Sequence, residues 1–132
     1  MINGSITWWE IRVPDVEKAQ AFYTAVFGAT AQPWDRYVML LDAEGKPFGA
    51  LEQTQDMVPT DAYIRSYFLA EDLEAALETI TAAGGSVERG RELISEEFGW
   101  WALARDPFGN WLGLCTSNAA AGPSSADAAR RG

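Results

Sequence analysis

The side chains available for chemistry are restricted, because the chain contains no histidine and a single cysteine, Cys115. Histidine is the commonest metal ligand and the usual proton-transfer group near neutral pH. Ser-His-Asp and Cys-His nucleophilic sites and histidine-containing zinc sites are therefore excluded. Acid-base chemistry would need a carboxylate, a tyrosine, a lysine or Cys115. The chain also has six tryptophans, which either fill a core or line a pocket.

Glu10 is the best candidate for a general base. It follows Trp8 by two residues in a segment that alternates like a strand, so the two side chains share one face. An apolar, tryptophan-lined wall makes a carboxylate a stronger base. The alternative is a carboxylate held in a salt bridge. Cys115 would act as a nucleophile only beside a base or a cation, and the alternative there is an inert buried thiol.

Composition excludes several classes of partner. The formal net charge of −9 argues against nucleic acid and anionic membrane surfaces, which need clustered lysine and arginine. No apolar run approaches the roughly 18 residues of a membrane span, and the N-terminus lacks the basic and apolar regions of a secretory signal. We expect a cytoplasmic protein without nucleic-acid or membrane partners. A single cysteine also excludes an intramolecular disulfide.

One strand and one helix must position these residues. The segment from Ile6 to Val13 alternates between two faces, and the more apolar face, which carries Trp9, should pack on a helix. Asp15 stands where a helix N-cap belongs. Apolar residues at helical spacing follow, and Gly28 can adopt the left-handed conformation that ends a helix.

This unit occurs a second time, 57 positions further along the chain. A helix cap, an acid in the first turn, a small packing residue and a terminal glycine agree together, which favours duplication of one supersecondary unit. The matching pairs are Asp15 and Asp72, Glu17 and Glu74, Ala19 and Ala76, and Gly28 and Gly85.

The remaining segments complete two βαβββ units, so the predicted fold class is α+β. In the first half, strands are expected at Thr30–Trp34, Tyr37–Leu41 and Phe48–Gln53. The second half should contain strands at Tyr63–Leu69, Ser86–Arg89, Phe98–Arg105 and Trp111–Thr116, with a polar loop at Arg91–Glu97. We predict one domain at 1–117, made of module one (5–54), a linker (55–61) and module two (62–117). Residues 118–132, rich in alanine, serine and glycine, should form a disordered tail.

Four stretches resemble the vicinal oxygen chelate superfamily, which contains glyoxalase I, extradiol dioxygenases, fosfomycin-modifying enzymes and bleomycin-binding resistance proteins. They span most of residues 6–117 and are closest to small bacterial glyoxalase-like proteins. The resemblance implies two βαβββ modules whose sheets curl around a cleft, and a homodimer. The stretches are W-E-I-x-V-P-D (Trp9–Asp15), A-F-Y-x-A-V-F-G (Ala21–Gly28), A-E-D-L-E-A-A-L (Ala70–Leu77) and D-P-F-G-N-W-L-G-L (Asp106–Leu114).

The metal ligands of that superfamily have no counterpart here. They come from the first and last strands of each half, and the resemblance assigns these positions to Trp8, Gly49, Arg65 and Gly113. None of these residues is a usual ligand for a divalent cation. A shift of one strand residue would bring Glu52 into place. We therefore expect neither a metal nor another cofactor.

The resemblance also implies which side chains would line a cleft without its metal. Arg65 would clamp a ligand carboxylate or pair with Glu10. Of Trp100 and Trp101, neighbours in a strand, at most one can face the cleft. The expected ligand-binding residues are Trp8, Gly49, Tyr67, Trp100, Trp111, Gly113 and Cys115.

Three functions follow from this arrangement. The leading hypothesis is a metal-independent binder of a small planar or hydrophobic molecule, acting by sequestration or resistance. The second is a metal-free isomerase, lyase or cyclase in which Glu10 moves a proton and Arg65 holds an anionic oxygen. The third is a non-catalytic module whose cleft is filled by its own tryptophans.

Overall fold

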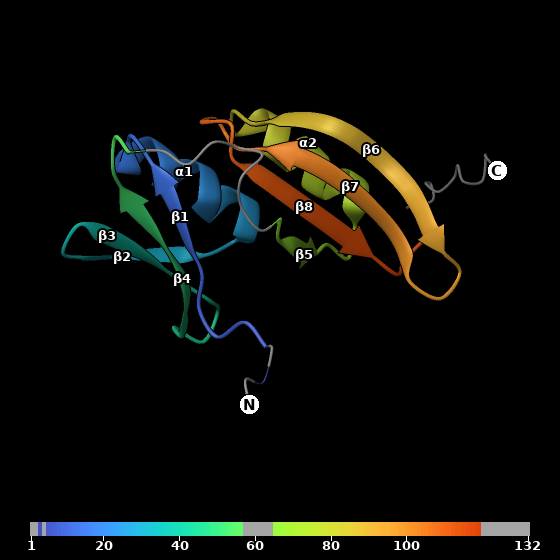
Figure 1. Cartoon of the computed structure of the whole chain (residues 1–132), viewed down its shortest axis with the longest axis horizontal. Helices are drawn as coiled ribbons and strands as arrows, with labels where there is room; N and C mark the ends of the chain where they lie inside the picture. Colours follow the sequence, from blue (N-terminus) through green and yellow to red (C-terminus); the bar gives the residue numbers. More distant parts are fainter. Residues whose placement is uncertain (1–2, 4, 57–64, 120–132) are drawn as a thin grey trace. The chain divides into compact units, whose positions relative to one another are not determined.

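The computed structural model describes residues 3, 5–56 and 65–119, which form two compact units, Met1–Pro59 and Thr60–Gly132 (Figure 1). The units have the same order of elements, and each is described by itself. The described residues contain no helix that is long and apolar enough to cross a membrane.

The first unit is a four-stranded mixed sheet with one helix. Its strand order is β1-β4-β3-β2, with β1 parallel to β4 and the other pairs antiparallel. The elements are β1 (Glu10–Val13), α1 (Val16–Phe27), β2 (Thr30–Trp34), β3 (Tyr37–Leu41) and β4 (Pro47–Gln53).

The second unit repeats this topology. Its strand order is β5-β8-β7-β6, with β5 parallel to β8 and the other pairs antiparallel. The elements are β5 (Tyr67–Leu69), α2 (Leu73–Ala82), β6 (Ser86–Ser95), β7 (Gly99–Arg105) and β8 (Trp111–Thr116). The predicted α+β class with two βαβββ modules is confirmed.

Both helices begin at the predicted aspartate caps. The Asp15 carboxylate accepts a hydrogen bond from the Lys18 backbone N–H at 3.2 Å, and the Asp72 carboxylate accepts one from Ala75 at 3.0 Å. These bonds satisfy backbone donors that a helix leaves without a partner. Gly28 ends α1 with φ of 63°, a backbone conformation that a glycine adopts without strain.

A second repeated element is the loop that leads into the last strand of each unit. The Asp42 carboxylate accepts from the backbone N–H groups of Glu44 and Lys46, at 3.0 and 2.9 Å. The Asp106 carboxylate does the same for residues 108 and 110, at 2.8 Å each. The D-P-F-G-N motif is thus a loop held by its own aspartate, and it has a counterpart of different sequence in the first unit.

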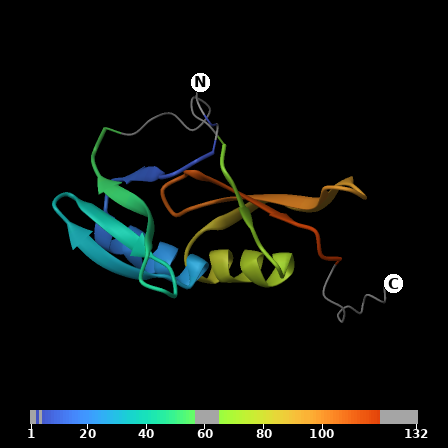
Figure 2. The same ribbon diagram turned by 90° about the horizontal axis from the view of Figure 1, so that it is seen from below.

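Each helix lies along one face of its sheet, and the core of each unit lies between them, as Figure 2 shows for α2. In the second unit the buried side chains on this side come from α2, β7 and β8. They are Leu73, Ile80, Ala102, Ala104, Leu112 and Leu114. The opposite face of the second sheet is covered by no helix of that unit's described part, and it contains the candidate site.

Three element predictions were wrong at their boundaries. Of the strand predicted at Tyr63–Leu69, Arg65 and Ser66 are described but are not strand, and β5 begins at Tyr67. The predicted loop at Arg91–Glu97 is largely strand, because β6 continues to Ser95. This segment has a polar composition because β6 is an edge strand with mostly exposed side chains. The first strand begins at Glu10 rather than Ile6, although the Trp9 carbonyl still accepts a bond from Ala50 N–H at 3.0 Å. Residues 57–61 of the predicted linker and 120–132 of the predicted tail lie outside the described residues.

Candidate functional site

The side chains of the second unit that point away from α2 form what we call the open face. Residues paired across neighbouring strands share one face of a sheet, and the register places Tyr67 beside Gly113 and Trp101 beside Cys115. Arg105 is likewise paired with Trp111. The open face also includes residues of β6, where the Arg89 guanidinium forms an ion pair with Glu92 and lies 5.5 Å from the centroid of the Trp101 ring. The open face comprises Arg65, Tyr67, Leu69, Arg89, Glu92, Ile94, Trp101, Leu103, Arg105, Trp111, Gly113 and Cys115.

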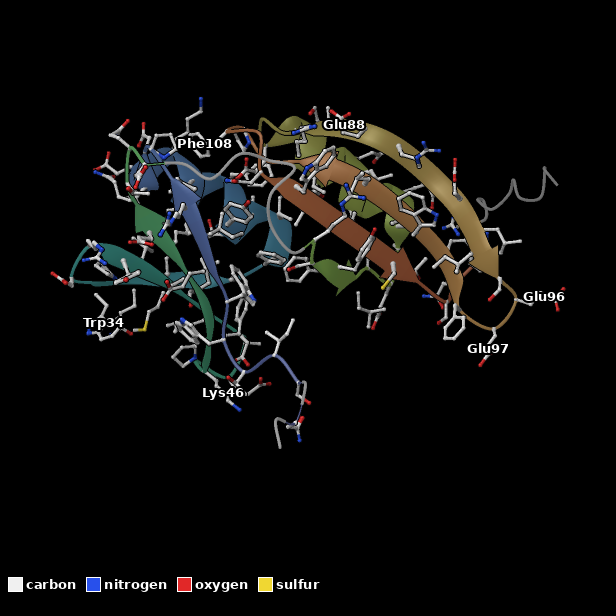
Figure 3. All side chains as sticks on the ribbon, in the orientation of Figure 1. Trp34, Lys46, Glu88, Glu96, Glu97 and Phe108 are labelled. Atoms are coloured by element: carbon white, nitrogen blue, oxygen red, sulfur yellow. The ribbon has the colours of Figure 1, made fainter. Side chains whose placement is uncertain are left out.

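One end of the open face is an apolar pocket of about 460 Å³. Tyr67 and Trp101 meet edge to face, with ring centroids 6.4 Å apart. Glu96 and Glu97 form the hairpin tip that joins β6 to β7 (Figure 3), and Phe98, the next residue in the chain, is 66% exposed. Exposed apolar side chains clustered in this way are typical of a binding surface. The lining residues are Tyr67, Ile94, Phe98, Trp101 and Cys115.

The other end of the open face is cationic and is built around Trp111. The guanidinium carbon of Arg105 lies 3.5 Å from the centroid of the Trp111 ring, and that of Arg65 lies 4.8 Å from it. Arg105 is the last residue of β7 and Arg65 precedes β5 by two residues, and these two strands flank β8. Arg105 Nε donates to Glu88 at 3.0 Å and its Nη1 to the Gly109 carbonyl at 2.9 Å.

Gly113 lies between the two ends, and its lack of a side chain leaves room for the Tyr67 ring. A Cβ atom on Gly113 would lie 2.6 Å from Cδ2 of Tyr67 and 2.7 Å from the Ser66 carbonyl oxygen. Real side chains do not tolerate such contacts. The glycine therefore lets Tyr67 lie flat against β8, where it also forms part of the pocket wall.

The structure brings Trp101, and not Trp100, together with Tyr67 and Cys115. Trp100 lies on the opposite face of β7, where the guanidinium of Arg91 stacks 5.2 Å from its ring centroid. Arg91 also forms two 2.7 Å hydrogen bonds with Glu74 of α2. These bonds lower the pKa of the Glu74 carboxyl, against an opposing effect of burial.

Trp101, Phe98 and Ile94 were missing from the sequence-based site. Two adjacent tryptophans in a strand must point to opposite faces of the sheet, but the sequence does not show which of them points to the pocket. Phe98 and Ile94 lie in or beside a segment that the sequence predicted as a loop. Side chains alternate between the two faces along β7, and Arg105 is paired with Trp111. Counting back from Arg105 in steps of two would have placed Trp101 on the face of Trp111.

In the first unit, Trp8 and Glu10 do share a face, as predicted. The Trp8 indole N–H donates to a Glu10 carboxylate oxygen at 3.3 Å, and Trp8 is 38% exposed. Gly49 lies on the other, helix-covered face, where a Cβ atom would overlap the Trp9 indole. From Gly49 to Gln53 the strand alternates regularly, so Gly49 shares the face of the buried Leu51, and Ala50 is the residue paired with Glu10.

The residues at the superfamily's ligand positions do not fit a divalent cation. The side chains of Trp8 and Arg65 are hydrogen-bond donors without a lone pair for a metal ion. Neither Gly113 nor Ala50 carries a ligand atom in its side chain. Glu52 lies on the same face as Glu10 but is bound to Arg36 at 3.1 Å and Arg12 at 3.6 Å. Within residues 3, 5–56 and 65–119, no three His, Cys, Asp or Glu side chains come together as a metal site would need.

The paired βαβββ units define the class of this protein. A profile of the Glyoxalase/Bleomycin resistance protein/Dioxygenase superfamily matches residues 5–114, and the chain belongs to this superfamily. A comparison with curated proteins finds no match.

Solved structures share the fold at low sequence identity. A glyoxalase/bleomycin resistance protein/dioxygenase family enzyme from Burkholderia phytofirmans PsJN is 14% identical, with a TM-score of 0.68 over 85% of this chain and 98% of that one. The fosfomycin resistance protein FosX from Mesorhizobium loti is 20% identical, with a TM-score of 0.66 over 89% and 95% of the two chains. FosX from Listeria monocytogenes, solved as a mutant with Mn(II) and 1S,2S-dihydroxypropylphosphonic acid, is 18% identical, with a TM-score of 0.68 over 90% and 93%.

Proposed function

We propose that this protein binds a small planar or hydrophobic molecule on the open face of its second unit, without a metal ion. The observation that carries the proposal is the apolar pocket of about 460 Å³ between Tyr67, Phe98 and Trp101. Its volume suits a small organic ligand, and flat rings can stack on its aromatic walls.

The residue types at the family's ligand positions support the metal-free part of the proposal. A binder that acts by sequestration needs affinity and no reacting group. Its ligand would be held by burial of apolar surface, which contributes about 25 cal/mol for each Å² removed from water. Retention of an organic molecule by protein from its own host, measured by native mass spectrometry with metal analysis of the same sample, would reveal the ligand's mass.

The test uses N-phenyl-1-naphthylamine, an uncharged planar probe whose fluorescence rises in apolar surroundings. We expect binding that survives dialysis against EDTA and is weakened at least several-fold by Phe98→Ser. Trp34→Ser is the matched control, because Trp34 is also an exposed aromatic residue (59%) but lies in the first unit. Glu10→Gln should bind the probe like the unchanged protein.

Three outcomes would overturn the proposal. They are no probe binding, binding that requires an added divalent metal, and binding that Trp34→Ser weakens as much as Phe98→Ser does. A second copy of the chain is the competing occupant of this face, since Leu69 is 73% exposed on edge strand β5. If a dimer covers the pocket, the apparent affinity of the probe should increase as the protein concentration is lowered and the dimer dissociates.

A further inference from the structure

We propose that the ligand is an elongated amphipathic anion, with its acidic head group at Arg65 and its apolar body in the pocket of Tyr67, Phe98 and Trp101. This inference rests on the proposed function and adds the chemical class of the ligand. It follows from three features of the open face, namely its two chemically different ends, their spacing and the state of Arg65.

The two arginines at the cationic end differ in what they bind. Arg105 is engaged by Glu88 and by the Gly109 carbonyl. Arg65 is exposed and lies over the Trp111 ring, 4.8 Å from its centroid. Among the residues that the structure describes, no carboxylate forms an ion pair with Arg65.

A guanidinium that lies over an indole remains able to bind an anion. Arg65 lies over the Trp111 ring at 4.8 Å, and the ring attracts its charge without using up its N–H donors, which stay available to an acceptor. These donors match the two oxygens of a carboxylate, and such paired bonds are among the strongest hydrogen bonds in proteins. An exposed arginine that lies over a ring and has its donors available therefore favours a carboxylate over an uncharged polar group.

The spacing of the two ends sets the length of the ligand. Trp111 and Cys115 are four residues apart on β8, a distance of about 13 Å along a strand. Gly113 lies between them, with the Tyr67 ring against it. A ligand that reaches from Arg65 to the pocket would cross this ring. A medium-chain fatty acid or an arylalkanoate has the required shape, with one charged end and an apolar body.

The test compares decanoate with decanol, below their aggregation limits, as competitors of N-phenyl-1-naphthylamine. In Arg65→Gln, decanoate affinity should fall about tenfold. The affinities for decanol and for the probe should stay unchanged, because neither carries a charge. Arg65→Lys should recover part of the decanoate affinity, since it restores the charge without the planar donor pair.

The matched control is Arg36→Gln, because Arg36 also lies over an aromatic ring, that of Tyr37 at 5.0 Å, but belongs to the first unit. Decanoate affinity should be unaffected there. Unchanged decanoate affinity in Arg65→Gln, with probe binding intact, would refute the anionic ligand and leave the proposed function standing. If the unchanged protein does not bind the probe at all, the proposed function itself is refuted.

Discussion

The guanidinium of Arg105 lies 3.5 Å from the centroid of the Trp111 ring and is held there at two further points. Glu88 accepts from Nε at 3.0 Å, and the Gly109 carbonyl accepts from Nη1 at 2.9 Å (Figure 3 labels Glu88). This arginine joins β6, β7 and the loop before β8 into one support for Trp111. Arg65, on the other side of β8, is free of such ties among the described residues. We infer that Arg105 positions the tryptophan and that Arg65 meets the ligand.

The first prediction separates these two roles. Arg105→Gln removes both the stack and the two hydrogen bonds, so we expect a loss of about 1 kcal/mol in the free energy of unfolding of the second unit. Arg65→Gln should cost less than half of that, because its side chain is exposed. Urea unfolding followed by tryptophan fluorescence measures both. Equal losses in the two variants would contradict the assignment.

The second prediction concerns the repeated aspartate loops. Asp106 is 3% exposed and also accepts a side-chain hydrogen bond from Asn110 at 2.8 Å. Asp106→Ala removes a nearly buried acceptor from two part-buried backbone N–H groups and from the Asn110 amide, which costs about 2 kcal/mol. Asp42→Ala removes the same two backbone bonds from a less buried loop, so about 1 kcal/mol is expected.

The comparison of these two loops is made by urea unfolding of each variant. The two alanine variants serve as controls for each other, because the backbone bonding of their loops is the same. If Asp42→Ala lowered the free energy of unfolding more than Asp106→Ala does, burial would not be what makes the Asp106 bonds the more stabilising ones.

The third prediction tests the close packing of β4 against Trp9. Gly49→Ala would place a methyl group inside the Trp9 indole, and overpacking of this kind costs about 1–3 kcal/mol. Gly90→Ala is the matched control, since no atom lies within 4 Å of the added Cβ on edge strand β6. Its effect should stay within about 0.5 kcal/mol. Thermal unfolding by circular dichroism distinguishes them, and a neutral Gly49→Ala would show that Trp9 moves aside readily.

The fourth prediction is a pH dependence of the second unit's stability. The hydrogen bonds from Arg91 lower the pKa of the Glu74 carboxyl in the folded protein. The ionised pair therefore stabilises the fold above the unfolded pKa of about 4.3. This stabilisation is lost as the pH falls through the lower, folded-state pKa. Since Glu74 is 43% exposed at its side chain, solvent screening limits the effect to about 1 kcal/mol.

Glu74→Gln tests this dependence. Its urea midpoint should lie below that of the unchanged protein at pH 7, and the difference should shrink as the pH falls below the unfolded pKa of about 4.3. Glu78→Gln, on the same helix, should differ little from the unchanged protein throughout this pH range. If the difference in urea midpoint between Glu74→Gln and the unchanged protein increased as the pH fell, the predicted direction of the pH dependence would be wrong.

The order of elements was readable from the residues because local rules set it. Asp15 and Asp72 cap helices through bonds within one turn, and Gly28 ends α1 through its own backbone angle. The strands of the second half were also readable, apart from the start of β5 and the length of β6. Its charged residues resemble a loop in composition, and only the pairing with β7 and the bonds from Arg91 to Glu74 make the segment a strand.

The site was readable only in part. Tyr67, Trp111, Gly113 and Cys115 follow from strict alternation along two strands, and they do share one face. Gly49 was expected on the same face as Glu10, but Ala50 is the residue paired with Glu10, so alternation places Gly49 on the helix-covered side. An error of one residue in the assumed register exchanges the two faces of a strand, and the local sequence does not specify the register of β1 with β4.

The sequence by itself determined the superfamily, the two βαβββ units and the absence of histidine chemistry, since these depend on residue types and short spacings. The tertiary structure alone decided that Trp101 rather than Trp100 joins the pocket. It also decided that Phe98 and Ile94 line this pocket, and that Arg65 and Arg105 meet at Trp111. These contacts join residues that are distant in the chain, and their geometry depends on strand register and on the long hairpin of β6 and β7. Those features are set by the packing of the whole sheet rather than by neighbours in sequence.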